Sequence, residues 1–217
     1  MNLEQIENKE EKIEIAKKIL DKVKDNQVIG VGSGSTVYLA VMELGKFLEE
    51  KNWNVKIIPA SVEIEELCKN YKNIKIGNLL EDEIDWGFDG ADEVDNNNNL
   101  LKGAGKALFR EKINILSSKT TTYILADKSK FVDKLGEKHL VPIEVFPRAL
   151  NYVSNELEKI GACEILYKGL TDNDNSMLNV KFDDGIELDK TLENAIKLIP
   201  GVIESGLFIG LNVTVLR

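Results

Sequence analysis

Strand-like apolar runs alternate with helical spacing of apolar residues over residues 13–127, and this alternation constrains the fold more than any other feature of the chain. The strand-like runs are 28–31, 55–58, 84–88 and 123–125. The runs with helical spacing are 13–23, 37–48 and 106–116. Ser61 is a typical N-cap for a further helix that ends near Lys69. Strands and helices in this order form a parallel sheet covered on both faces, so the sequence predicts a Rossmann-like α/β domain.

The pattern changes after about Gly136. Strands and helices then follow in the order βαββαβ, which predicts a small ferredoxin-like α+β domain. Its runs are 141–145, 149–160, 164–167, 178–182, 192–199 and a strand from Val202. Asp183-Asp184-Gly185, between 178–182 and 186–188, predicts a hairpin turn, and Asn96 to Asn99 a hairpin or loop tip.

The apolar tail, residues 207–216, is expected to return to the first sheet, so the small domain is predicted to be an insertion. The predicted catalytic α/β domain therefore covers residues 1–132 plus 207–217, and the predicted small domain covers residues 133–206.

Composition and charge argue against several classes of protein. The chain of 217 residues is 43% hydrophobic and 30% charged, which is ordinary for a globular protein. A formal charge of −9 argues against nucleic acid and anionic membranes as partners. The polar N-terminus does not have the apolar stretch of a secretory signal, and no apolar run approaches the roughly 18 residues of a membrane span.

The cysteine and histidine content points to a cytoplasmic protein without a metal. Cys68 and Cys163 lie far apart, which fits free thiols in a reducing cytosol. His139 is the only histidine and lies in a polar stretch, which argues against a Ser-His triad and against a histidine-based zinc site.

A glycine-rich loop joins the strand at 28–31 to the next helix. It reads Gly30-Val31-Gly32-Ser33-Gly34-Ser35-Thr36. Glycines allow the backbone to approach a ligand, and the N–H groups at a helix start favour an anion. The loop has Ser35 at the third glycine position of the dinucleotide fingerprint and no lysine before Ser35 or Thr36 as in a P-loop. It is therefore interpreted as a site for one phosphate, although a tight turn capped by hydroxyl groups remains the alternative.

Acidic residues follow another predicted strand at the same edge of the sheet. Asp89-Gly90-Ala91-Asp92 comes directly after the run 84–88, and ligands of open parallel sheets bind beyond this edge. Asp89 and Asp92 could hold sugar hydroxyls or transfer protons. The alternative is a polar loop whose aspartates cap turns.

Glu111 lies on an apolar helical stripe with Leu108 and Ile115. A carboxylate at such a position is costly unless it is paired or functional, and partial burial makes it a better base near neutral pH. The alternative is a structural salt bridge. Lys102-Gly103-Ala104-Gly105 precedes this helix, and Lys130 follows Asp127 just beyond another strand end.

Together, these segments resemble the ribose-5-phosphate isomerase type A family, and the similarity covers nearly the whole chain. Each motif alone is weakly specific, but the ordered set is highly specific. The segments are Gly32 to Thr36, Asp89 to Glu93, Lys102 to Gly105 with Leu108 and Arg110 to Lys112, Ala126-Asp127 with Ser129-Lys130, Pro142 to Val145, Thr171 to Asn173 and Ile199 to Val202.

The resemblance implies an enzyme of the non-oxidative pentose phosphate pathway that interconverts ribose 5-phosphate and ribulose 5-phosphate through an enediolate, without metal or cofactor. It implies that Glu111 is the proton-transferring base, assisted by Asp89, Asp92 and Lys102. It also implies homodimers or homotetramers. The implied substrate-binding residues are Ser33, Gly34, Ser35, Thr36, Asp89, Gly90, Ala91, Asp92, Lys102, Gly103, Ala104, Gly105, Lys130 and Lys12.

The chain departs from the family pattern at three positions. Ser33 replaces a usual threonine and keeps the hydroxyl. Ala104 replaces a usual glycine, and a positive φ at that position would cost about 1 kcal/mol. Lys106 replaces a small residue and is expected to alter the charge at the rim of the pocket.

Two other functions fit a related fold. A sugar-phosphate sensor domain would need no base at Glu111 and would normally carry a helix-turn-helix segment, for which the residues before the first strand leave no room. A coenzyme A transferase would use the glutamate as a nucleophile and form a covalent thioester on it.

Overall fold

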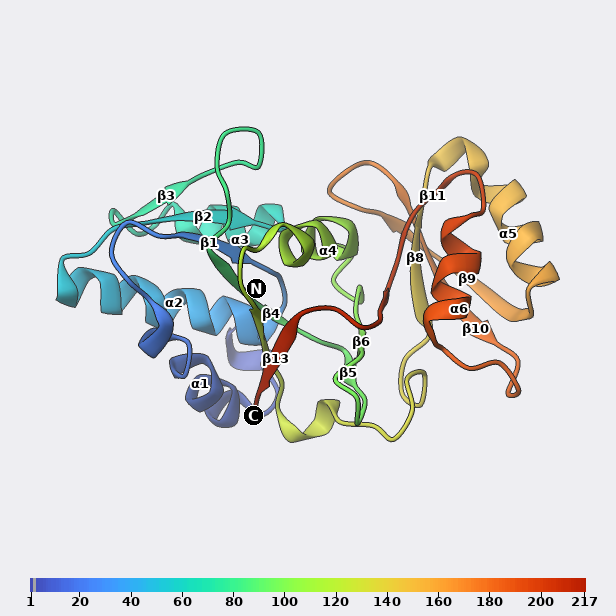
Figure 1. Ribbon diagram of the computed structural model, residues 1–217, viewed down its shortest axis with the longest axis horizontal. Helices are drawn as coiled ribbons and strands as arrows, with labels where there is room; N and C mark the ends of the chain where they lie inside the picture. The colour runs from blue at the N-terminus through green and yellow to red at the C-terminus, as the bar shows by residue number, and fades with distance from the viewer. Residues whose placement is uncertain (2) are drawn as a thin grey trace. The chain divides into compact units, whose positions relative to one another are not determined.

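The computed structural model describes residues 1 and 3–217 of the chain. They form two compact units (Figure 1). The first unit comprises Met1–Ala91, Arg110–Lys130 and Asn212–Arg217. The second comprises Asp92–Phe109 and Phe131–Leu211. The predicted boundaries of independently folding domains, at 132 and 207, stay a prediction.

The first unit is built on a six-stranded parallel sheet with the order β13-β7-β4-β1-β2-β3. Its strands are β1 (Val28–Val31), β2 (Val55–Pro59), β3 (Ile74–Ile76), β4 (Trp86–Gly90), β7 (Thr122–Leu125) and β13 (Val213–Leu216). The chain runs outward from β1 through β2 to β3, and then returns to the other side of β1 for β4 and β7. The carboxyl ends of β1 and β4 therefore flank a topological switch point, where open α/β sheets bind ligands.

Helices cover both faces of this sheet. They are α1 (Lys9–Lys17), α2 (Ser35–Lys51), α3 (Val62–Cys68) and α4 (Leu108–Ser117), with short 3₁₀ turns at Leu3–Gln5, Leu20–Lys22 and Lys128–Lys130. The apolar residues of α1, α2 and α3 share one core with β1, β2 and β4. Helix α4 lies on the other face, where Asn114 donates to the Ile58 carbonyl at 2.9 Å (Figure 1). The predicted Rossmann-like domain is confirmed.

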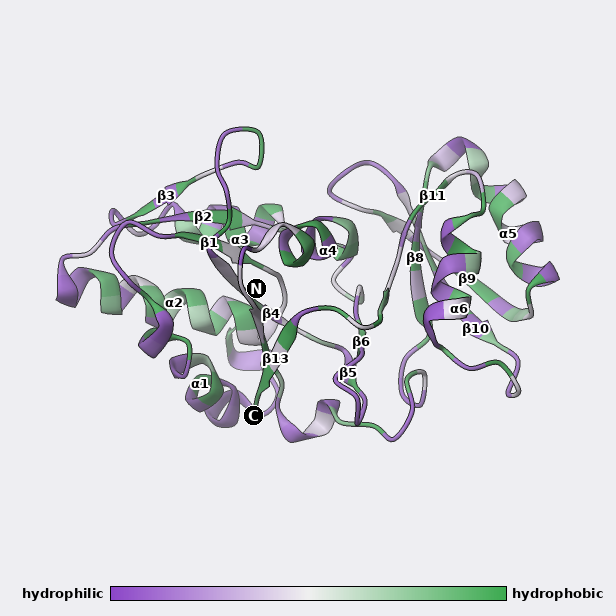
Figure 2. Cartoon of the chain, in the orientation of Figure 1, coloured by the Kyte–Doolittle hydropathy of each residue, from purple (hydrophilic) through white to green (hydrophobic). Residues whose placement is uncertain are grey.

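The second unit contains a four-stranded antiparallel sheet with the order β11-β8-β10-β9. Its elements are β8 (Val141–Val145), a 3₁₀ turn at Pro147–Ala149, α5 (Leu150–Lys159), β9 (Ala162–Leu170), β10 (Ser176–Phe182), α6 (Lys190–Lys197) and β11 (Val202–Ser205). Helices α5 and α6 each have a hydrophilic and a hydrophobic side (Figure 2), and their apolar residues form a second core with this sheet. The βαββαβ order and this strand order are those of the predicted ferredoxin-like fold.

A three-stranded antiparallel sheet in the second unit has no counterpart among the predicted elements. It consists of β5 (Glu93–Val94), β6 (Leu100–Leu101) and β12 (Leu207–Phe208). Residues Asn96 to Asn99 connect β5 to β6, so the predicted hairpin tip is confirmed. Among the described helices, none is long and apolar enough to cross a membrane.

One predicted strand pairing is wrong, and another is confirmed only in part. Asp183-Asp184-Gly185 forms a turn, but 186–188 is not a strand, because Ile186 and Leu188 pack against the second core instead of pairing with β10. The apolar tail, residues 207–216, is divided between two sheets. Only β13 joins the first sheet, beside β7, whereas Leu207 and Phe208 pair with β6 of the small sheet.

Candidate active site

The glycine loop leaves β1 at Val31 and enters α2 at Ser35. Gly34 precedes the helix with φ 93° and ψ 174°, a conformation that side chains with a Cβ rarely adopt. Gly32 is needed for a different reason, because a Cβ there would lie 1.8 Å from Asp89 Oδ1. The loop can therefore pass close to the end of β4 only with glycine at position 32.

The Asp89 carboxylate joins the end of β4 to this loop. Asp89 is buried, and its Oδ1 accepts hydrogen bonds from the backbone N–H of Ser33 at 3.2 Å and of Gly90 at 2.7 Å. The Gly32 N–H also donates to the Phe88 carbonyl at 2.9 Å. The glycine loop and the carboxylate loop, predicted to share one edge of the sheet, are thus in direct contact.

Glu111 faces this same edge from α4. Its side chain is 3% exposed, and Leu108 and Ile115 of the same stripe are also buried, as their spacing predicted. Ser33 Oγ donates a hydrogen bond of 2.7 Å to Glu111 Oε1. The Glu111 carboxylate is buried and oriented by the hydroxyl of Ser33 in the glycine loop, so it is suited to take and return a proton.

Lys12 borders the other side of the loop, and Asp127 and Lys130 lie close to Lys12. Lys12 of α1 is buried and donates to Ser35 Oγ at 3.1 Å, while its Nζ lies 3.9 Å from Asp127 Oδ2. Burial lowers the pKa of Lys12, and Lys130 lowers it further, whereas Asp127 acts against this shift. The positive groups beside Ser35 and the N-terminus of α2 make this end of the loop favourable for an anion.

The Asp127 carboxylate stays ionised despite its burial. Burial acts to raise the pKa of Asp127, but hydrogen bonds from Ser129 Oγ and N, together with Lys12 and Lys130, outweigh it and lower that pKa. The sequence placed Asp127 at this edge without assigning it a role. The signal was available, because Asp127 follows the end of β7 just as Asp89 closes β4.

Asp92 and the predicted site residues Lys102 to Gly105 lie in the second unit and are described there by themselves. Asp92 Oδ2 accepts the Ala104 N–H at 2.9 Å, so Asp92 orders the loop that follows Lys102. Lys102 is buried, and its Nζ lies 5.7 Å from the centre of the Phe208 ring. Gly103 has φ 118°, and a Cβ there would meet Leu108 and Pro142.

The strained residue of this loop is not the one that the sequence suggested. Ala104 does not have a positive φ, whereas Lys106 has φ 61°. The Lys106 N–H donates to the Gly103 carbonyl at 2.9 Å, and closing this turn sets the conformation of Lys106. The possible strain from a positive φ at Ala104 is therefore absent, and Lys106 is the residue of this loop in a strained conformation.

Comparison with known proteins gives the same family over most of the chain. The family model described as ribose 5-phosphate isomerase A (phosphoriboisomerase A) matches residues 56–217. Ribose-5-phosphate isomerase A of Methanocaldococcus jannaschii is 39% identical over 211 residues, which cover 93% of this chain and 91% of the relative. Its namesake in Trichodesmium erythraeum is 39% identical over 209 residues, which cover 92% of this chain and 86% of the relative.

Solved structures agree with these sequence matches. The structure of ribose 5-phosphate isomerase A from M. jannaschii matches with a TM-score of 0.89 and 37% identity, over 97% of this chain and 96% of that one. A D-ribose-5-phosphate isomerase solved in complex with phospho-erythronic acid matches with a TM-score of 0.86 and 36% identity, over 99% and 95%. The chain therefore belongs to the ribose 5-phosphate isomerase A family, as its ordered motifs predicted.

Proposed function

We propose that this chain is an aldose–ketose isomerase that interconverts ribose 5-phosphate and ribulose 5-phosphate, with Glu111 transferring a proton between C2 and C1. The observation that carries the proposal is the buried Glu111 carboxylate, 2.7 Å from Ser33 Oγ of the glycine loop. Family membership supports the substrate and the reaction class. The phospho-erythronic acid complex of a related isomerase supports it too, because that ligand combines a phosphate with a carboxylate that resembles a planar enediolate.

The phosphate would bind at the start of α2. The backbone N–H groups of Gly34 to Thr36 have the geometry of a helix N-terminus, and Ser35 and Thr36 add hydroxyl groups. Lys12 and Lys130 supply positive charge beside Ser35. Local positive charge of this kind lets a chain with a formal charge of −9 bind a dianionic substrate.

Glu111 would then take the proton from C2 of the open-chain aldose and return it to C1. The hydroxyl proton on the C2 oxygen moves to the C1 oxygen, which completes the ketose. A well-placed base typically contributes about 10²–10⁴-fold to the rate. Ser33 fixes the direction of the Glu111 carboxylate through its hydrogen bond, in addition to the role proposed for it in substrate binding.

Asp89, Asp92 and Lys102 complete the proposed set. Asp89 assists ring opening, and its contacts with Ser33 and Gly90 also keep the loops in place. Lys102 and the N–H groups of Gly103 and Gly105 stabilise the enediolate oxygen, for which each preorganised donor is worth about 3–4 kcal/mol. Asp92 positions the sugar hydroxyls, and Gly90 and Ala91 line the substrate beside it.

Solvent-exchange kinetics test the reaction. The chain is incubated with ribose 5-phosphate in D₂O buffer that contains a metal chelator, and the ketose is followed by absorbance and NMR. Ketose should form, with solvent deuterium incorporated at C1, because Glu111 exchanges its proton with solvent. Absence of ketose would reject the proposed activity. Full transfer of the C2 hydrogen to C1 without deuterium would reject the proton-transfer mechanism and favour a hydride shift.

The assembly is proposed to be a cytoplasmic homodimer or homotetramer, which rests on the family resemblance. Light scattering coupled to size-exclusion chromatography should give a mass of two or four chains. A mass of one chain at micromolar concentration would reject this part of the proposal.

A further inference from the structure

Glu93 has a fully buried carboxylate that the proposed reaction does not use. Its Oε2 accepts the Gly136 N–H at 2.6 Å, and its Oε1 accepts the N–H groups of Lys138 and His139 at 2.7 Å each. All these residues belong to the second unit. Hydrogen bonds to an ionised acceptor are stronger than neutral ones, so the three bonds fix the segment around Glu93.

The segment that Glu93 holds has no secondary structure of its own. Residues 133–140 contain neither helix nor strand, and they lead directly into β8. Gly136 has φ 89°, a turn in the chain at the point where the N–H groups of Gly136, Lys138 and His139 bind the Glu93 carboxylate. Buried backbone donors need partners, and here a single side chain supplies the acceptor for three of them.

Glu93 is also joined to the predicted site residues by the strand that carries it. It lies next to Asp92 and opposite Leu101 of β6, and the Asp92 N–H donates to the Leu101 carbonyl at 2.9 Å. Lys102 follows Leu101 directly. On the other side, the Val132 N–H donates to the Val94 carbonyl at 3.0 Å. A shift of Glu93 would therefore move the backbone of Asp92 and of the strand before Lys102.

We propose that Glu93 is a positioning residue, which holds Asp92 and the loop Lys102 to Gly105 in the arrangement that turnover requires. This inference rests on the proposed function, because it uses the roles proposed for Asp92 and Lys102. The groups proposed to bind phosphate, Lys12 and the start of α2, are in the first unit. Loss of the Glu93 contacts should therefore lower kcat and leave phosphate binding intact.

Glu93→Gln is the direct test. Its amide NH₂ replaces one carboxylate oxygen and faces at least one backbone N–H group, so the three bonds cannot all form. We expect kcat to fall by at least about tenfold, since a misplacement of about 1 Å can cost on the order of 10²-fold. We expect the inhibition constant of inorganic phosphate to stay within about twofold of wild type, because the groups proposed to bind phosphate do not include Asp92 or Lys102.

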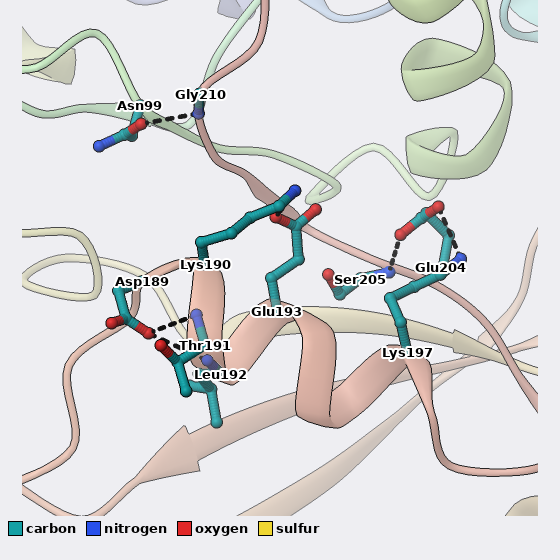
Figure 3. A network of polar contacts seen from close by, with 10 residues as sticks. All are labelled: Asn99, Asp189, Lys190, Thr191, Leu192, Glu193, Lys197, Glu204, Ser205 and Gly210. Atoms are coloured by element: carbon teal, nitrogen blue, oxygen red, sulfur yellow. Dashed lines mark hydrogen bonds and ion pairs between the residues drawn. The ribbon is translucent and has the colours of Figure 1, made fainter.

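Asp189→Ala is the matched control. Asp189 also binds backbone N–H groups in the second unit, those of Thr191 and Leu192 at 2.9 and 3.0 Å, but at the start of α6 (Figure 3). This variant should lower Tm and keep the wild-type kcat. If Glu93→Gln does not fold, Glu93→Asp serves instead, because its shorter carboxylate keeps the charge and reaches fewer of the three donors.

NMR-detected amide exchange separates this inference from the proposed function. The N–H groups of Asp92, Gly136 and His139 should be protected in the wild-type chain and exchange faster in the Glu93 variant, whether or not the chain isomerises the sugar. A wild-type chain without activity that shows this exchange pattern would reject the function and leave the positioning contact standing. If the wild type is active, a folded Glu93 variant with the wild-type kcat and the wild-type exchange rate at the Asp92 amide would overturn the inference. A Glu93 variant that loses kcat and phosphate affinity by the same factor would also overturn it.

Discussion

Ser33 contacts two of the carboxylates that the sequence singled out, those of Asp89 and Glu111. Its N–H donates to Asp89 and its hydroxyl donates to Glu111, so one residue of the glycine loop sets the positions of two acidic side chains. The backbone contact survives any substitution except proline, whereas the side-chain contact depends on the hydroxyl.

Ser33→Ala should therefore lower kcat by about tenfold and leave the fold intact. A hydrogen bond to a charged group is worth about 1.5–3 kcal/mol, and part of this is lost when Glu111 can turn away. Steady-state kinetics with ribose 5-phosphate measure the effect. Ser33→Thr keeps the hydroxyl and should keep at least about half of the wild-type kcat. Equal activity of the alanine and wild-type chains would show that the Ser33 hydroxyl does not orient the base.

Lys106 has a conformation that a glycine would adopt without strain. A left-handed conformation costs an L-residue roughly 1–2 kcal/mol. Lys106→Gly should therefore be more stable than Lys106→Ala by about 1 kcal/mol in urea unfolding, because both variants lose the side chain and only glycine relieves the strain. An alanine variant as stable as the glycine variant would argue against the positive φ.

Residue patterns predicted which side chains would gather but not the backbone angles between them. Asp89 and Ser33 follow strands that end at one edge, and Glu111 lies on an apolar stripe, so their contact follows from topology. The φ of Lys106 follows from closing a turn back to Gly103, and neither residue type nor spacing carries that information.

The pair Lys12 and Asp127 joins helix α1 to the residues after β7. Asp127 is buried and has a lowered pKa, so it contributes stability that is fully present above the pKa of an unfolded aspartate, about 3.9. This contribution is lost as the pH falls through the lower pKa of the folded state. Lys12 stays charged in the folded and the unfolded chain at acidic pH, so it does not change how the free energy of unfolding depends on pH there.

Asp127→Asn should lower the free energy of unfolding by about 1–3 kcal/mol at pH 7, the usual effect of weakening hydrogen bonds to a buried charged group. The difference from wild type should shrink as the pH falls below about 4, because Asp127 binds a proton there in the unfolded wild-type chain and only at lower pH in the folded one. Urea titrations of both chains from pH 7 to pH 3 measure this. A difference that is the same at every pH would contradict the role of the ionised carboxylate.

Long elements were predictable from periodicity, and short ones were not. The run 141–145 coincides with β8, and Ser61 caps α3 by accepting the Ile64 N–H at 3.3 Å. Strands β5, β6 and β12 have two residues each, too few for any period, and they exist because the chain brings them side by side. The turn at Asp183 to Gly185 has the sequence of a hairpin turn, but Ile186 and Leu188 after it pack against the second core and do not pair as a strand.

At the scale of the whole chain, two apolar cores correspond to the change of pattern near Gly136. The sequence predicted both architectures, because each follows from the order of strands and helices. It did not predict that residues 92–109 would group with the second unit, since this grouping depends on pairing between β6 and β12, which lie about a hundred residues apart in the sequence. The family was predictable because its motifs recur in order along nearly the whole chain.

The kinetics of Glu111→Gln show whether the Glu111 carboxylate transfers the proton between C2 and C1. Glutamine keeps the shape and the hydrogen bond from Ser33 Oγ but cannot take a proton. The variant should fold, bind inorganic phosphate with the wild-type affinity, and lose about 10²–10⁴-fold in kcat. A kcat within a few-fold of wild type in a folded, phosphate-binding variant would show that Glu111 does not move the proton.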